Sequence, residues 1–181
     1  MGDRRGLQGV LPLGLPFTDE GIDAVAARMR LLASVAPAVA FENNVNYFNL
    51  GPPAEEPNFW NAICRAAGCG MLLDLHNVYT QCKNNGLDAR EFVDRVDGAN
   101  VIEIHLSGGS DSDGAWLESR RVMRLDSHDS PIPEDVWDLL ARVVPRCPNL
   151  RGIVVERLNA TLGADGVALL RAEVRRAKEA S

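Results

Sequence analysis

The chain has 181 residues, a net charge of −6 and a hydrophobic content of 46%. A chain of this length can bury a core without disulfide bonds or a structural metal, and we expect a single domain over residues 1–181. The acidic balance argues against a protein that binds nucleic acid by neutralising phosphates. No stretch reaches the roughly 18 apolar residues of a membrane span, and the residues after Met1 lack the apolar segment of a signal peptide. The sequence therefore predicts a soluble, cytoplasmic protein that binds neither nucleic acid nor membranes.

The first half of the chain predicts two helices that alternate with two strands. Thr18 has the features of a helix N-cap, since two acidic residues follow it and apolar residues then recur at helical spacing. The two strands are short apolar runs that each end in an acidic residue. After a Gly/Pro-rich lead over residues 9–16, the predicted elements are a helix over 18–33, a strand over 38–42, a helix over 59–66 closed by Gly68, and a strand over 70–74.

The second half continues the alternation after Asn84-Asn85-Gly86, which we interpret as a turn. Asp88 is a candidate N-cap for the next helix, and Pro133 stands near the first turn of a later one. The predicted elements are a helix that begins after Asp88 and contains Phe92 and Val93, a strand over 101–106, a long loop over 107–130, a helix over 133–145, a strand over 152–156 and a final helix over 167–178.

Each of the four predicted strands carries a carboxylate or an imidazole at or near its carboxyl end: Glu42, Asp74, His105 and Glu156. Strands that alternate with helices indicate an α/β fold with a parallel sheet, and in such folds the chemistry gathers at the carboxyl ends of the strands. A closed (β/α)8 barrel takes about 250 residues. Four strands in this chain therefore predict a TIM-barrel-like parallel βα repeat that forms a partial barrel.

A D-x-H motif lies in the long loop, where Asp126 and His128 would face the same side of an extended segment. Such a pair suits a metal or an acid/base couple, and the alternative is a turn in which Asp126 bonds the backbone. The other histidines, His76 and His105, also stand near acids. A donor set of Asp, Glu, Asn and His without cysteine favours Fe(II), Mn or Zn. The four cysteines show no metal-site spacing, so we interpret them as reduced structural residues: Cys64, Cys69, Cys82 and Cys147.

Several motifs, in chain order, resemble the DUF692 family, the multinuclear non-haem iron-dependent oxidative enzymes of TIM-barrel fold that include the iron enzyme of methanobactin biosynthesis. They lie within roughly residues 12 to 160 and are Phe41-Glu42-Asn43, Leu72 to Tyr79, Glu103 to Gly108, Leu125 to Asp129 followed by Val136-Trp137, and Val155-Glu156-Arg157. The resemblance implies an O2-dependent enzyme with two or three iron ions. It would modify residues, often cysteines, of a ribosomally made precursor peptide that a partner protein presents.

The resemblance also implies a metal-ligand set. By motif, Glu42 is similar to the carboxylate that bridges the irons, and the other ligands come from the remaining strand ends and the D-x-H motif. The full implied set is Glu42, Asp74, Asn77, His105, Asp126, His128 and Glu156. Gly109 stands where the family often has a histidine, and the family's first-half histidines have no counterpart before Glu42.

We therefore expect the chain to correspond to the C-terminal half of a (β/α)8 barrel. In such a half barrel the first and last strands have open edges, which favour a homodimer or another partner chain. Two alternative functions remain open. One is a Zn- or Mn-dependent isomerase or hydrolase on a xylose-isomerase-like barrel, and the other is a non-catalytic half barrel that serves as an assembly partner.

Overall fold

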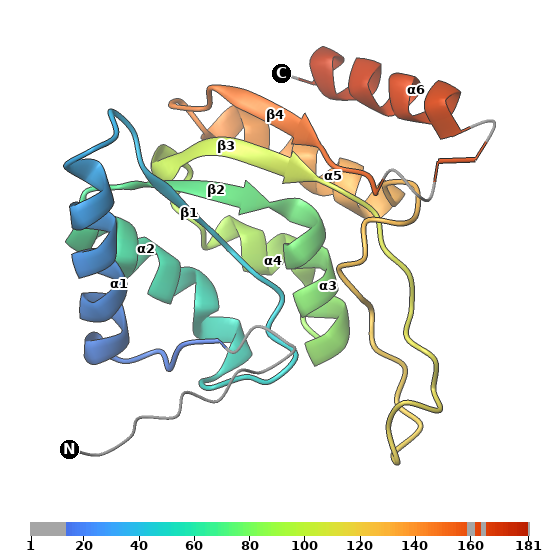
Figure 1. The fold of residues 1–181 in the computed structure, drawn as a ribbon, viewed down its shortest axis with the longest axis horizontal. Helices are drawn as coiled ribbons and strands as arrows, with labels where there is room; N and C mark the ends of the chain where they lie inside the picture. Colours follow the sequence, from blue (N-terminus) through green and yellow to red (C-terminus); the bar gives the residue numbers. More distant parts are fainter. Residues whose placement is uncertain (1–13, 159–161, 164–165, 181) are drawn as a thin grey trace.

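A computed structural model describes residues 14–158, 162–163 and 166–180, which form one four-stranded parallel sheet with helices packed against it (Figure 1). The sheet has the order β1-β2-β3-β4, so each strand lies beside its neighbour in sequence. This is the predicted α/β class, a partial TIM-barrel-like βα repeat. The residues after Met1, where no signal peptide is expected, and most of the Gly/Pro-rich lead lie outside the described residues. None of the described helices is long and apolar enough to cross a membrane.

The strands and helices alternate along the chain almost as predicted. The strands are β1 (Ala40–Glu42), β2 (Gly70–Asp74), β3 (Val101–Leu106) and β4 (Gly152–Val155). The α-helices are α1 (Asp19–Ala33), α2 (Glu56–Ala67), α3 (Leu75–Asn85), α4 (Ala89–Asp94), α5 (Glu134–Val143) and α6 (Gly166–Glu179). Short 3-10 turns are η1 (Pro53–Glu55), η2 (Gly98–Asn100) and η3 (Val144–Arg146).

The capping residues act where the sequence predicts them. The Thr18 hydroxyl accepts a hydrogen bond from the Gly21 amide at the start of α1, at 3.2 Å. The Asp88 side chain accepts hydrogen bonds from the backbone amides of Arg90 and Glu91 in the first turn of α4. Gly68 ends α2 with a φ of 65°, a left-handed conformation that costs glycine little. These local signals set the ends of the helices that carry the sheet.

Helix α3 was not predicted, and the interpretation of Asn84-Asn85-Gly86 as a turn is wrong. The two asparagines are the last residues of α3, and Gly86 is its C-cap. Leu75, Val78 and Cys82 recur at helical spacing on its buried face, but they share that face with buried polar side chains. Its buried polar residues are His76, Asn77, Thr80, Gln81 and Asn84.

The core lies between the sheet and α2, α3, α4 and α5. Trp60 and Trp137 are both buried in it. All four cysteines are free thiols, and Cys64, Cys82 and Cys147 are buried, which agrees with a structural role. Because the core side chains fix the strands from one side, the carboxyl ends of the strands are held in register. Asp74 of β2 and His105 of β3 are direct partners in that register.

The outer strands of the sheet are β1 and β4. A groove of about 640 Å³ runs along β4, between η3 and α6, and Val154 in its wall is 38% exposed. An apolar edge strand with unpaired backbone groups favours association.

We expect the Val154→Lys variant to shift the purified chain toward monomer, measured by light scattering over a concentration series. Val167→Lys, on the exposed side of α6, is the matched control, and a monodisperse wild-type monomer would contradict the prediction.

Candidate metal centre

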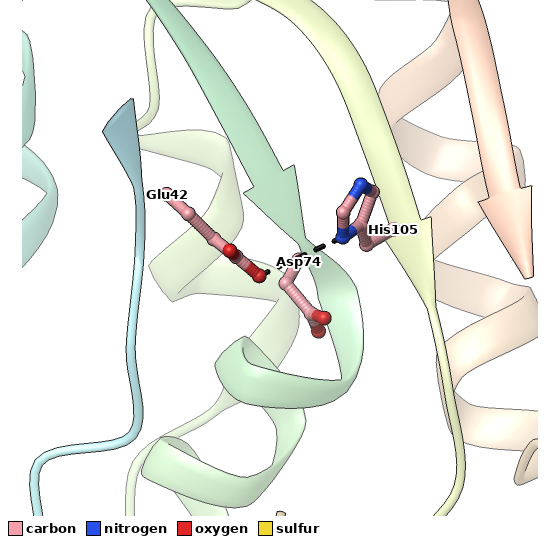
Figure 2. A group of neighbouring side chains, drawn as sticks. All are labelled: Glu42, Asp74 and His105. Carbon is pink, nitrogen blue, oxygen red and sulfur yellow. Dashed lines mark ion pairs between the residues drawn. The ribbon is translucent and has the colours of Figure 1, made fainter. Parts of the chain in front are cut away.

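Three strands deliver one polar side chain each to the same point at the carboxyl edge of the sheet. Glu42 ends β1, Asp74 ends β2, and His105 is the penultimate residue of β3. One potential ligand atom from each of the three lies within 4.8 Å of the other two. Figure 2 shows the Glu42 carboxylate and the His105 ring facing one another across the end of β2, from which Asp74 projects. These three residues are called the strand-end trio below.

His105 lies at the centre of the carboxylates. Its Nδ1 atom is 3.6 Å from Glu42 Oε1 and 3.3 Å from Glu156 Oε1. Its Nε2 atom is 2.9 Å from Glu103 Oε1, a contact that follows from the two-residue period of a strand. Glu103 therefore orients the ring and leaves Nδ1 directed at the other two carboxylates. That nitrogen is buried and makes no hydrogen bond.

The D-x-H motif continues this chain of contacts through Glu156. The second carboxylate oxygen of Glu156 is 3.5 Å from His128 Nδ1, and His128 Nε2 is 2.7 Å from Asp126 Oδ1. The same Asp126 oxygen lies 3.5 Å from Nδ1 of His76. The strand-end trio, Glu156 and the D-x-H pair thus form one continuous cluster, which we call the carboxylate–imidazole cluster.

The expectation that the D-x-H motif is extended is wrong. His128 has a φ of 53°, in the left-handed region that a residue with a side chain rarely adopts. This turn brings the ring back against Asp126, and the Leu158 amide donates to the His128 carbonyl at 2.9 Å. Contacts with neighbouring segments therefore stabilise a left-handed turn at His128, which an extended strand would not contain.

Two asparagines join the strand ends beneath the cluster. The Asn43 side chain donates to the Asp74 carbonyl at 3.0 Å and accepts from the Asp74 amide at 2.8 Å. Asn77 donates from its side chain to the Asn43 carbonyl at 2.9 Å, and its backbone amide donates to Asp74 Oδ1 at 2.7 Å. Asp74 is therefore the N-cap of α3 through one oxygen. Its other oxygen and the Asn77 side-chain oxygen are buried without a partner.

Burial and like charges keep protons on part of the cluster. Burial raises the pKa of Asp74 to about 7, helped by the charges of Asp126 and Glu42 and opposed by the hydrogen bond from Asn77. Burial also raises the pKa of Glu42, while His105 acts to lower it. Carboxyls that crowd together without a cation are expected to retain protons in this way. A divalent cation would replace those protons.

The pKa values of Asp126, His128 and His76 shift in different directions. Burial alone would raise the pKa of Asp126, but the adjacent His128 and His76 rings outweigh it and hold that pKa well below its usual range. The hydrogen bond to Asp126 raises the pKa of His128. Burial lowers the pKa of His76, against the pull of Asp126. The arrangement favours a charged Asp126–His128 pair beside a neutral His76.

The residues present suit a hard or borderline divalent metal. Among the described residues, four buried polar atoms at or beside the cluster have no hydrogen-bond partner, and each is a competent metal donor: Asp74 Oδ2, His76 Nδ1, Asn77 Oδ1 and His105 Nδ1. Unsatisfied buried polar atoms are costly, and a bound cation would reduce that cost for the atoms it contacts. Mixed carboxylate and imidazole ligands favour iron, manganese or zinc. Of the predicted ligands, Glu42, Asp74 and His105 have donor atoms close enough together to hold one ion. Asn77, Asp126, His128 and Glu156 remain predicted ligands.

Two residues that contact the cluster stand outside the ligand set that the sequence implies. His76 is fully buried on α3, and Glu103 is the partner of the His105 ring. The sequence signal for Glu103 was its two-residue spacing from His105 on one strand. The position of His76 depends on α3, which was not predicted although Leu75, Val78 and Cys82 recur at helical spacing.

Comparisons with known proteins place the chain in a family. The profile described as the RiPP precursor modification enzyme MbnB/TglH/ChrH matches residues 3–181. A UPF0276 protein of Rhizorhabdus wittichii is 33% identical over 135 residues, which cover 74% of this chain and 46% of the relative. UPF0276 proteins of Pseudomonas aeruginosa and Neisseria meningitidis are 33% and 32% identical, over 79% and 80% of this chain and 48% and 50% of the relatives.

The chain therefore spans about half the length of the curated relatives it matches. The name UPF0276 carries no statement of substrate or reaction. The family profile covers nearly all of the chain, including every residue of the carboxylate–imidazole cluster. On that match, the chain belongs to the MbnB/TglH/ChrH family of RiPP precursor modification enzymes.

Proposed function

We propose that this protein takes part in the iron-dependent, O2-dependent oxidative modification of a ribosomally synthesised precursor peptide. The observation that carries the proposal is the carboxylate–imidazole cluster, with its unpartnered buried donor atoms, in a chain that the family profile matches throughout. We further propose that the described sheet corresponds to the C-terminal half of a (β/α)8 barrel. The active protein would then include a second set of strands beside β1 and β4.

The cluster offers ligands for two neighbouring metal positions. Glu42, Asp74 and His105 would hold one ion. Asp126 and His128, which contact each other, would contribute to a second position, and Asn77 would add its side-chain oxygen as a further ligand. Glu156 contacts the His105 ring with one oxygen and the His128 ring with the other, so it would hold metal beside either imidazole. Bound iron would supply the electron-transfer chemistry that O2 requires and that protein side chains lack.

The remaining residues position and charge this site. Glu103 accepts from His105 Nε2 and so directs Nδ1 to the metal, as carboxylates behind metal-bound histidines commonly do. Asn43 holds the end of β2 against the end of β1 through two hydrogen bonds. The raised pKa of Asp74 means that metal uptake releases a proton near neutral pH.

The substrate would be a peptide residue, often a cysteine, presented by a partner protein in the cytoplasm. Thiols that form no disulfide, as at the four cysteines of this chain, are typical of that compartment. The modified residue would approach the cluster from the carboxyl edge of the sheet, where chemistry gathers in parallel α/β folds.

Metal analysis tests the proposal directly. We expect the chain, purified from iron-supplemented cells, to contain iron and to show visible charge-transfer absorption. Because the chain spans half the length of its relatives, we expect fewer than the two or three irons of the family and weak retention on dialysis. Colourless zinc or manganese would favour an isomerase or hydrolase instead. Metal content at background would favour a non-catalytic assembly partner.

A loop ligand gives a cleaner variant than a strand ligand. We expect His128→Ala to lower the iron content while leaving the circular dichroism spectrum unchanged, because residue 128 lies outside every helix and strand. Asp129→Asn is the matched control, since Asp129 binds the hydroxyls of Ser110 and Ser130 rather than the cluster. Loss of the folded signal in His128→Ala would show that His128 has a structural role.

A further inference from the structure

An apolar groove of about 550 Å³ lies beside the carboxylate–imidazole cluster. Its two walls are the segment after β1 and the long segment between β3 and α5, which runs away from the carboxyl ends of the strands (Figure 1). The lining residues are Tyr47, Phe48, Ser112, Trp116, Leu117, Ser119, Arg121, Met123, Leu125, Asp126 and Ser127. We call this feature the aromatic groove.

The aromatic groove and the cluster share Asp126. One oxygen of this residue contacts His128 at 2.7 Å and His76 at 3.5 Å, while the residue also lines the groove. The Asp126 amide donates to the Tyr47 hydroxyl at 3.0 Å, which joins the two walls at this end. A ligand in the groove would therefore lie beside the proposed metal site.

The walls of the groove present large apolar side chains to solvent. Phe48 is 59% exposed, Trp116 68% and Leu117 41%. Large apolar side chains that stay exposed around a concave site mark a binding surface. A ligand that covers them lowers the free energy by removing their apolar area from water. The hydroxyls of Ser112, Ser119 and Ser127 interrupt the apolar lining and could pair with a peptide backbone.

The wall between β3 and α5 is held in place before any ligand arrives. Asp111 and Arg124 form an antiparallel bridge, and the Ser112 amide donates to the Met123 carbonyl at 2.7 Å. Asn84 of α3 fastens this hairpin-like segment, accepting from the Arg124 amide at 2.8 Å and donating to its carbonyl at 2.9 Å. A preformed wall reduces the ordering cost of binding.

We infer that the aromatic groove binds an aromatic or branched aliphatic side chain of the precursor peptide, adjacent to the residue that is modified at the cluster. The inference rests on the proposed function for the identity of the ligand. Its physical basis is the continuity of the groove with the cluster through Asp126. The groove would set which residue of the peptide reaches the metal, because an anchored neighbour leaves one position in reach.

The three tryptophans make the binding step observable. Trp60 and Trp137 are buried, and Trp116 lies in the groove wall. The chain labelled with 5-fluorotryptophan would be titrated with the blocked peptide acetyl-Gly-Phe-Cys-Gly-amide and with its Phe→Ser analogue, with ¹⁹F NMR as the readout. We expect a saturable shift of the Trp116 resonance alone, with at least tenfold weaker binding of the serine peptide. Equal responses to both peptides, or no response of Trp116, would overturn the inference.

Variants separate the groove from the rest of the surface. We expect Leu117→Asp to lower peptide affinity at least tenfold, whereas Leu31→Asp, on the exposed face of α1, leaves it unchanged. Both variants are checked for folding by circular dichroism. Unchanged binding by folded Leu117→Asp would contradict the inference. A second groove variant, Phe48→Ser, gives the same test if Leu117→Asp does not fold.

The same titration in chelator-treated protein distinguishes this inference from the proposed function. Peptide binding by the metal-free chain, together with failure to take up iron, would overturn the proposed function and support the groove. Iron uptake without a response of Trp116 would overturn the groove and leave the proposed function in place.

Discussion

The Asp74→Asn variant is expected to lose metal binding while it keeps its fold. Asp74 has two separate duties, since one oxygen caps α3 and the other is buried without a partner at the cluster. Asparagine retains an oxygen for the cap but has no negative charge and places a donor where a ligand is needed. We expect metal affinity to fall by more than about 100-fold, beyond the 10–100-fold loss typical of residues behind the ligands.

Metal content by mass spectrometry and affinity by chelator competition measure this effect. Asp74→Ala is the informative control, because it removes the cap as well and is expected to cost about 1 kcal/mol of stability in addition. Urea unfolding separates the two variants. Wild-type metal affinity in Asp74→Asn would show that the strand-end trio is not a ligand set.

The stability of the protein is expected to fall as pH rises from about 5 to about 9, and Glu56 is the main cause. This glutamate begins α2 and is 2% exposed. One carboxylate oxygen accepts from the Asn46 side chain, and the other has no partner. Burial raises the pKa of Glu56 from 4.5 to about 8, although the hydrogen bonds from Asn46 and Gln81 oppose the rise.

The sign follows from proton binding. Between pH 4.5 and 8 the folded state holds a proton on Glu56 that the unfolded state has released. The contribution of Glu56 to stability is therefore fully present below pH 4.5 and declines up to pH 8. The loss amounts to at most roughly 5 kcal/mol. Glutamine stays neutral, so Glu56→Gln is expected to be more stable than the wild type at pH 9 and about equal to it at pH 4.5.

Urea unfolding at several pH values measures this difference. Burial raises the pKa of Asp74 as well, so the metal-free Glu56→Gln variant should retain a smaller slope of the same sign. Glu55→Gln, at the exposed neighbouring position, is the matched control and should leave the slope near its wild-type value. Identical pH profiles for Glu56→Gln and the wild type would show that Glu56 is ionised in the folded protein.

The sequence by itself determined the order of strands and helices and the polar residues at the strand ends. Apolar runs that end in Glu42, Asp74 and Glu156 are local patterns, as are the caps at Thr18 and Asp88. Such signals act over a few residues and need no partner segment. The parallel sheet then follows from the alternation of elements, because each helix returns the chain to the same edge.

Only the tertiary structure decided how the polar residues meet. His76 reaches Asp126 because it is buried on α3, a helix that was not predicted from the sequence. His128 reaches Asp126 through a left-handed turn that neighbouring segments hold. The unpartnered atoms of Asp74 and His105 also depend on which neighbours use up the other atoms of each side chain. These contacts join residues far apart in the chain, and their geometry is set by packing, which local patterns do not encode.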